Sequence, residues 1–173
     1  GLSSTTVLPP TSIDITSYAI EADGDTSGYL YINGTGSGEF VRYAKDGSTS
    51  EDVEVLAGAA AGSLTGYVLK FEGDDVYVIP SGATGPTGRV TRISTDGGAT
   101  FALQDMLDFT TAGPPDSLRG VAVDGTTMYV ISHQDDCVLY EADISGTLPA
   151  TANALFTLTG YNDCSGLAVD DDF

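Results

Sequence analysis

The stretch LRGVAVDGTTMYVISHQDDCVLYEADISG, Leu118 to Gly146, decides the fold class of this chain. Valine, tyrosine, isoleucine and threonine gather there in short runs, and these residue types favour extended strands. Clusters containing glycine and aspartate separate the runs, as expected for tight turns. The stretch therefore predicts three short antiparallel strands, and no segment of the chain has a long apolar period typical of a helix.

The same order of strands occurs three times along the sequence. The predicted second strand of each repeat carries a tyrosine, and Tyr31, Tyr77 and Tyr129 recur at intervals of about 50 residues. Four short antiparallel strands at this period are typical of one blade of a β-propeller. A single blade needs a neighbour on each side to bury its two faces.

We therefore predict an all-β fold, a β-propeller built from four-stranded antiparallel blades. The segment SGLAVDDD repeats RGVAVDGT, so the chain is expected to begin a fourth blade and to form an incomplete ring. Further propeller sequence or another copy of the chain would then close the ring. The expected divisions are an edge strand or linker at 1–16, blades at 17–60, 61–112 and 113–160, and the start of the fourth blade at 161–173.

Some segments have two interpretations. The expected fourth strands cover residues 51–58, 100–107 and 152–160. Two segments, 56–64 and 103–107, have spacing that also suits a helical turn.

The charge of the chain excludes some partners. Aspartate and glutamate number 25 against 6 basic residues, which gives a net charge of −19. Nucleic-acid binding needs a basic face, so it is not expected, and neither is docking onto anionic lipid. No apolar run is long enough for direct membrane insertion. The acidity has three interpretations: a solvated surface, a high-salt habitat, or divalent-cation binding by loop carboxylates, with calcium as the candidate cation.

Two resemblances accompany this pattern. Leu118 to Gly146 resembles NHL repeats and the related six-bladed gluconolactonase-like propellers, and SGLAVDDD matches the opening of that unit. STDGGATF resembles the Asp-box (BNR motif) of sialidase-like propellers, and it implies a structural hairpin on the rim. The residues that match this box are Ser94, Asp96, Gly98, Thr100 and Phe101.

Candidate site residues are few. Propeller sites lie at the axis, and the lactonase-like enzymes hold a divalent cation there with Glu, Asn and Asp. The resemblance thus points to Asp116, Asn162 and Asp163 as metal ligands, while the alternative is that they are solvated turn residues. His133 is the only histidine, and Asp135 or Asp136 is its expected partner if it acts as a general base.

Two further features concern covalent chemistry. Cys137 and Cys164 form either one disulfide, which indicates an oxidising compartment, or two buried free thiols. Asn33 begins the sequon Asn-Gly-Thr and is a candidate for glycosylation.

No catalytic motif is present. We therefore expect a non-catalytic, extracellular or surface-exposed propeller module that acts in assembly or recognition within a larger surface, fibre or virion structural protein. Its expected partners are other surface or structural proteins, and no cofactor is required. One alternative is a lactonase-like or strictosidine-synthase-like hydrolase with an axial metal. The other is a lectin-like propeller that binds glycans, for which the only hints are Tyr43, Phe71 and Tyr140.

Overall fold

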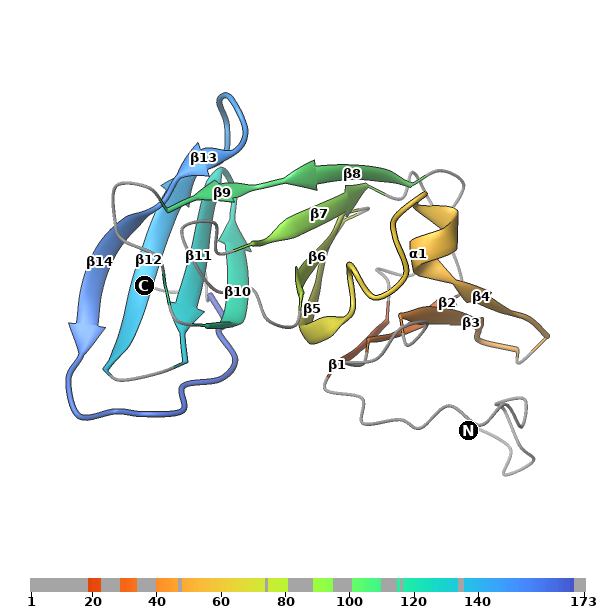
Figure 1. Cartoon of the computed structure of the whole chain (residues 1–173), viewed down its shortest axis with the longest axis horizontal. Helices are drawn as coiled ribbons and strands as arrows, with labels where there is room; N and C mark the ends of the chain where they lie inside the picture. Colours follow the sequence, from red (N-terminus) through yellow and green to blue (C-terminus); the bar gives the residue numbers. More distant parts are fainter. Residues whose placement is uncertain are drawn as a thin grey trace.

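The computed structural model describes most of the chain as an all-β protein. The described residues are 19–22, 29–33, 40–46, 48–73, 75–80, 89–94, 101–109, 115, 117–133 and 136–169. They form three four-stranded antiparallel sheets, a two-stranded parallel ladder and one short helix. The three larger sheets lie side by side in the order of the sequence (Figure 1). Within these residues, no helix has the length and apolar character needed to cross a membrane.

Each large sheet is a simple meander in which neighbours in sequence are neighbours in space, apart from one short strand skipped in the third. The first sheet contains β1 (Ala19–Ala22), β2 (Tyr29–Asn33), β3 (Val41–Ala44) and β4 (Ser50–Asp52). The second contains β5 (Gly66–Glu72), β6 (Asp75–Pro80), β7 (Thr91–Ser94) and β8 (Ala102–Asp105). The third contains β10 (Leu118–Asp124), β11 (Thr127–Ser132), β12 (Cys137–Asp143) and β14 (Asn153–Leu158).

Two smaller elements connect these sheets. The helix α1 (Val53–Leu56) directly follows β4. The strand β9 (Leu107–Asp108) pairs in parallel with β13 (Ala150–Thr151), so that the end of the second sheet is hydrogen-bonded to the connection before β14. This ladder crosses from one sheet to the next at the upper side of the view in Figure 1.

The sequence repeat is also a repeat of strand register. Tyr31 pairs with Arg42, Tyr77 pairs with Arg92, and Tyr129 pairs with Glu141, each between the second and third strands of its sheet. The pairing between the first and second strands of a sheet also has the same irregularity in two sheets. The register shifts between Gly66 and Val68 in the second sheet and between Leu118 and Gly120 in the third. The tyrosines therefore occupy equivalent places in three copies of one unit.

The middle sheet is buried on both faces. Val76 and Val78 of β6 pack into the core shared with the first sheet, whereas Tyr77 and Ile79 pack into the core shared with the third. Because successive side chains of a strand point to opposite faces, one strand contributes to both cores. Aromatic pairs lie in each core: Tyr31 meets Phe71 edge-on at 4.9 Å, and Phe109 meets Tyr140 at 5.2 Å.

The arginines of the third strands take part in packing. Arg42 is 5% exposed, and its Nε and Nη2 both contact Glu51 Oε2 at 2.7 Å. Its guanidinium lies over the Tyr29 ring at 4.1 Å and the Phe101 ring at 5.0 Å. Phe101 precedes β8 of the second sheet, so this cation–π contact joins two sheets. Arg92, in the equivalent register position, pairs with Asp75 at 3.6 Å.

Three expectations for local structure were wrong in part. The fourth strand of the first repeat ends at Asp52, because the Asp52 carboxylate accepts from the N–H groups of Glu54 and Val55 and caps α1. The predicted strand at 100–107 is divided, since β8 ends at Asp105 and β9 begins at Leu107, and the alternative helical turn at 103–107 does not form. The expected first strand of a fourth blade is irregular over residues 161–169, where no described strand pairs with it.

In two of the turns that follow a third strand, an aspartate side chain accepts a hydrogen bond from the serine two residues later. Asp46 Oδ1 accepts from the Ser48 N–H at 2.8 Å, and Asp143 Oδ1 accepts from the Ser145 N–H at 2.9 Å. Hydrogen bonds from the serine side chain and backbone lower the pKa of Asp143 below its ordinary value, and Ser48 lowers the pKa of Asp46 in the same way. In the order of the repeat, these turns correspond to the Asp-box-like sequence of the second repeat, which also follows the third strand.

The hydrogen bonds from Ser145 to Asp143 can be tested through the pKa of the Asp143 carboxyl group. Replacing Ser145 with alanine removes the hydroxyl that stabilises the charged carboxylate, so the pKa of Asp143 should rise toward the usual value of about 3.9. The stabilising effect of the wild-type turn is present above that pH and is lost as the pH falls through the lowered pKa. An NMR titration of the carboxyl carbons measures the change, and Asp46 is the internal control. An unchanged Asp143 titration would contradict the role given to the Ser145 side chain.

Candidate functional site

The third sheet presents a face that no other described sheet covers. Gly120 pairs with Ile131, Ile131 with Leu139, and Leu139 with Phe156, so their side chains follow one another across all four strands. Tyr129 lies two residues before Ile131 and shares its face. We call this surface the open face, and it comprises Gly120, Ala122, Tyr129, Ile131, Leu139, Glu141 and Phe156.

The equivalent face of the second sheet is closed. Ile79 of β6, Val90 just before β7 and Met106 just after β8 lie in the corresponding places, with Met106 hydrogen-bonded to Val90. They are 1%, 0% and 0% exposed, because the third sheet packs on them. On the open face Phe156 is 49% exposed. The same comparison holds for the repeated tyrosines: Tyr31 is 0% and Tyr77 3% exposed, whereas Tyr129 is only half-buried. The difference arises because the second sheet packs over Tyr31 and the third sheet packs over Tyr77, whereas no described sheet packs over Tyr129.

Part of the open face is covered by the segment 161–169. The Gly166 N–H donates to the Arg119 carbonyl at 3.1 Å. A Cβ atom on Gly120 would lie 2.9 Å from the Gly166 carbonyl carbon and 3.0 Å from the Leu167 Cβ, so only glycine permits this approach. The covering sequence Gly166–Val169 itself resembles Gly120–Val123 of β10, the first strand of the third sheet.

A disulfide fixes this segment to the third sheet. Cys137 in β12 is bonded to Cys164, with their Cα atoms 6.0 Å apart. Two backbone hydrogen bonds accompany the bridge, from the Cys137 N–H to the Tyr161 carbonyl at 3.2 Å and from the Asp163 N–H to the His133 carbonyl at 3.0 Å. Of the two alternatives for these cysteines, the structure contains the disulfide.

His133 contacts the same segment through both ring nitrogens. Its Nε2 lies 3.4 Å from Asp163 Oδ1, and its Nδ1 lies 3.3 Å from the Cys164 carbonyl oxygen. The histidine partner is thus Asp163, while Asp136 instead accepts a hydrogen bond from the Gly160 N–H and Asp135 lies outside the described residues. Because the Asp163 side chain is 83% exposed and both nitrogens face the segment, the arrangement suits positioning of the segment better than base catalysis.

The predicted metal ligands are only partly placed. Asp116 lies outside the described residues, Asn162 is exposed, and Asp163 contacts His133. Among the residues with described positions, no three His, Cys, Asp or Glu side chains gather in a way that would hold a metal ion. Asn162 and Asp163 are therefore not part of a described ligand set.

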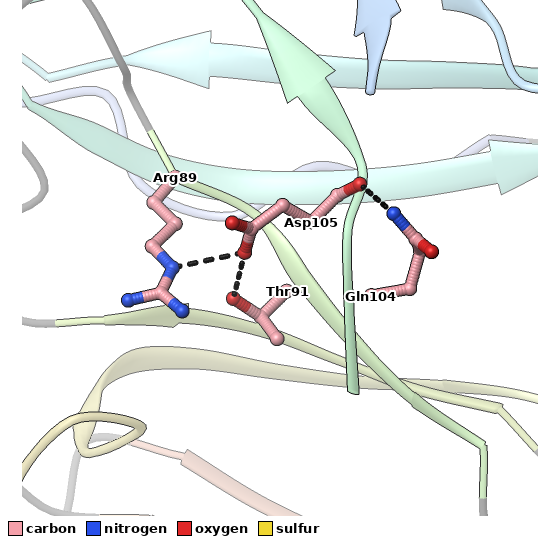
Figure 2. Close-up of polar contacts among 4 residues, drawn as sticks. All are labelled: Arg89, Thr91, Gln104 and Asp105. Carbon is pink, nitrogen blue, oxygen red and sulfur yellow. Dashed lines mark hydrogen bonds and ion pairs between the residues drawn. The ribbon is translucent and has the colours of Figure 1, made fainter. Parts of the chain in front are cut away.

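A second polar cluster lies on the second sheet, and Figure 2 shows its members pointing toward one another. Asp105 Oδ1 accepts from Arg89 Nε at 3.0 Å and from the Thr91 hydroxyl at 3.2 Å, while Gln104 Nε2 donates to the Asp105 carbonyl at 2.9 Å. The Arg89 and Asp105 side chains are 43% and 54% exposed. This cluster joins Asp105 of β8 to Thr91 of β7 and to Arg89 just before β7. An exposed ion pair such as Arg89–Asp105 contributes about 1 kcal/mol or less to stability.

Two buried polar side chains hold the connection between the first and second sheets. Glu54 is 1% exposed, and its carboxylate accepts from the N–H groups of Gly62 at 2.6 Å and Leu64 at 2.7 Å. Asn33 is 0% exposed, donates to the Leu64 carbonyl at 3.2 Å and accepts from the Gly66 N–H at 3.1 Å. The amide nitrogen of Asn33 is thus enclosed and bonded, so the fold gives it a structural role in place of the glycosylation suggested by the sequon.

The remaining sequence candidates also take structural places. Tyr43, Phe71 and Tyr140 are 1%, 8% and 5% exposed and pack in cores, which leaves no described aromatic glycan platform at these three positions. Of the Asp-box-like residues, Ser94 ends β7 and Phe101 packs against the core between the first two sheets. Asp96, Gly98 and Thr100 lie outside the described residues.

Comparison with known proteins identifies no family model that matches the sequence and no curated protein similar to it.

Proposed function

We propose that this chain is part of a β-propeller and acts as a non-catalytic assembly module, with the open face of the third sheet as its assembly surface. The observation that carries the proposal is the row of side chains that ends in the exposed Phe156, whose counterpart in the second sheet is buried by the next sheet. Stacked repeats bury their faces only against neighbours, so the end of a series needs a cover.

We propose a further repeat of the same kind as the occupant of this face. The segment Gly166–Val169 repeats the sequence of β10 and lies beside Gly120 at the start of β10. It therefore stands where the first strand of a fourth sheet would pack against the third. In the two inter-sheet contacts already present, the first strand of one sheet likewise meets the first strand of the sheet before it, β5 with β1 and β10 with β5.

An extracellular or surface location fits this function. The disulfide is typical of oxidising compartments, and the net charge of −19 keeps a protein well solvated outside its assembly surface. The NHL-like and Asp-box-like segments are in keeping with the propeller architecture but carry no activity by themselves.

The proposal predicts self-association of the chain through the uncovered part of the open face. Sedimentation velocity over a range of concentrations should detect reversible association that strengthens with salt, because salt screens the repulsion between acidic chains. Replacing Phe156 with lysine should weaken association by at least about tenfold, since a charge would be buried without a partner. Val55→Lys is the matched control, because Val55 is an apolar residue that is 73% exposed on α1, away from the open face.

A lengthened chain tests the identity of the occupant. A chain in which an additional copy of residues 125–160 follows residue 170, with lysine in place of the phenylalanine that corresponds to Phe156 in the added copy, should fold its added strands onto the open face. The lysine prevents the added copy from presenting the same apolar surface again. The lengthened chain should then be monomeric and melt at a higher temperature than the original chain. A monomeric original chain at every concentration, or a lengthened chain that still associates through Phe156, would overturn the proposal.

A further inference from the structure

We infer that the Cys137–Cys164 disulfide is a redox-sensitive anchor that determines whether the segment 161–169 covers the open face. This inference rests on the proposed function, because it concerns control of the same assembly surface. The two cysteines lie in different settings. Cys137 belongs to the hydrogen-bonded ladder between β12 and β14, whereas Cys164 lies in a segment with no strand pairing.

The other contacts of the segment are few. Four backbone hydrogen bonds hold it, two at Tyr161, one at Asp163 and one at Gly166. The His133 ring adds contacts to Asp163 and Cys164. Most residues from 161 to 169 are exposed, and Tyr161 is 64% exposed. A segment with so little burial opens readily unless it is tied to a stable element. The disulfide is the only covalent tie that the described residues provide.

The surface beneath the segment is apolar and closely fitted. Ile131 is 7% exposed, and the Gly120 position has no room for a side chain while Gly166 and Leu167 lie above it. Release of the segment would therefore uncover the inner part of the open face next to the already exposed Phe156. Reduction should therefore enlarge the apolar surface available to a second copy of the chain.

The chemistry is ordinary thiol–disulfide exchange with a dithiol reductant. One reductant thiolate attacks Cys164 Sγ, which is in the more exposed partner, and the bond to Cys137 Sγ breaks to give a mixed disulfide. The second reductant thiol then displaces Cys164, so that the reductant leaves as a cyclic disulfide. Two electrons pass to the protein, and both cysteines end as thiols.

Amide hydrogen exchange of the 173-residue chain, with and without dithiothreitol, tests this inference. Reduction should speed exchange of the Gly166 and Asp163 amides by at least about tenfold and leave the amides of β11 unchanged. The double variant Cys137→Ser, Cys164→Ser should exchange fast at Gly166 with or without reductant, which excludes other effects of dithiothreitol. Sedimentation of the same samples reports on the open face, and the reduced chain should associate more strongly.

The outcomes separate the two proposals. Unchanged exchange at Gly166 after complete reduction would overturn the anchor. Equal loss of protection in β11 and in the segment would also overturn it, because the bridge would then hold the sheet itself. Faster exchange at Gly166 without association in either redox state would support the anchor and contradict the proposed assembly function.

Discussion

Replacing Glu54 with glutamine is expected to lower the free energy of unfolding by about 3 kcal/mol, a large share of the stability of a small protein. The Glu54 carboxylate is buried and accepts two hydrogen bonds, from the backbone N–H groups of Gly62 and Leu64. A glutamine side chain has one acceptor oxygen, and its amide nitrogen would face an N–H group that also donates. One buried donor would then lose its partner.

Chemical denaturation followed by circular dichroism measures this effect. Val55→Gln is the matched control, because Val55 is the next residue of α1 and is 73% exposed, so its replacement should change stability by about 0.5 kcal/mol or less. An equal midpoint for Glu54→Gln and wild type would mean that the carboxylate does not hold the connection between the first two sheets.

Glu54 also shows where sequence reasoning reached its limit. The alternation of apolar residues and the repeated tyrosines predicted the all-β class, because strand period and turn composition are local properties of the sequence. Residues 51–58 were predicted as a strand, and nothing in the sequence distinguished the carboxylate of Glu54 from the many other acidic residues. Its burial depends on the loop that returns over α1 to Leu64, a non-local contact that no local pattern encodes.

For the candidate site, too, the sequence predicted some residues, whereas the contacts between them depend on the fold. The sequence singled out His133, Asp163, Cys137 and Cys164 for separate reasons, and the structure brings all four to one corner of the third sheet. The pairing of His133 with Asp163 was not predicted, because Asp135 and Asp136 are nearer in sequence. The open face was foreseen only as an unfinished repeat, since the exposure of Tyr129 and Phe156 depends on which sheet packs above them.

Replacing Asn33 with alanine is the other change for which we expect a large effect, a loss of about 3 kcal/mol. The side chain makes one donor and one acceptor contact with the chain that leads into β5, and its removal leaves the Leu64 carbonyl and the Gly66 N–H buried without these partners. Asn153→Ala is the matched control, because Asn153 is exposed on β14. Denaturation midpoints measure both variants, and similar losses for the two would contradict the bridging role of Asn33.

Asn33 and Glu54 should not act independently, because both bind the backbone of Leu64. Asn33 donates to the Leu64 carbonyl, and Glu54 accepts from the Leu64 N–H. Loss of either side chain therefore loosens the backbone at Leu64, which the other side chain also binds. We therefore expect the double variant Asn33→Ala, Glu54→Gln to lose less stability than the two single losses together, with a coupling of about 1 kcal/mol or more. A double-mutant cycle from denaturation curves measures this coupling, and Val55→Gln combined with Asn33→Ala is the uncoupled reference. Additive losses would mean that the two side chains stabilise separate parts of the connection, and the first and second sheets would then be joined mainly by their apolar core.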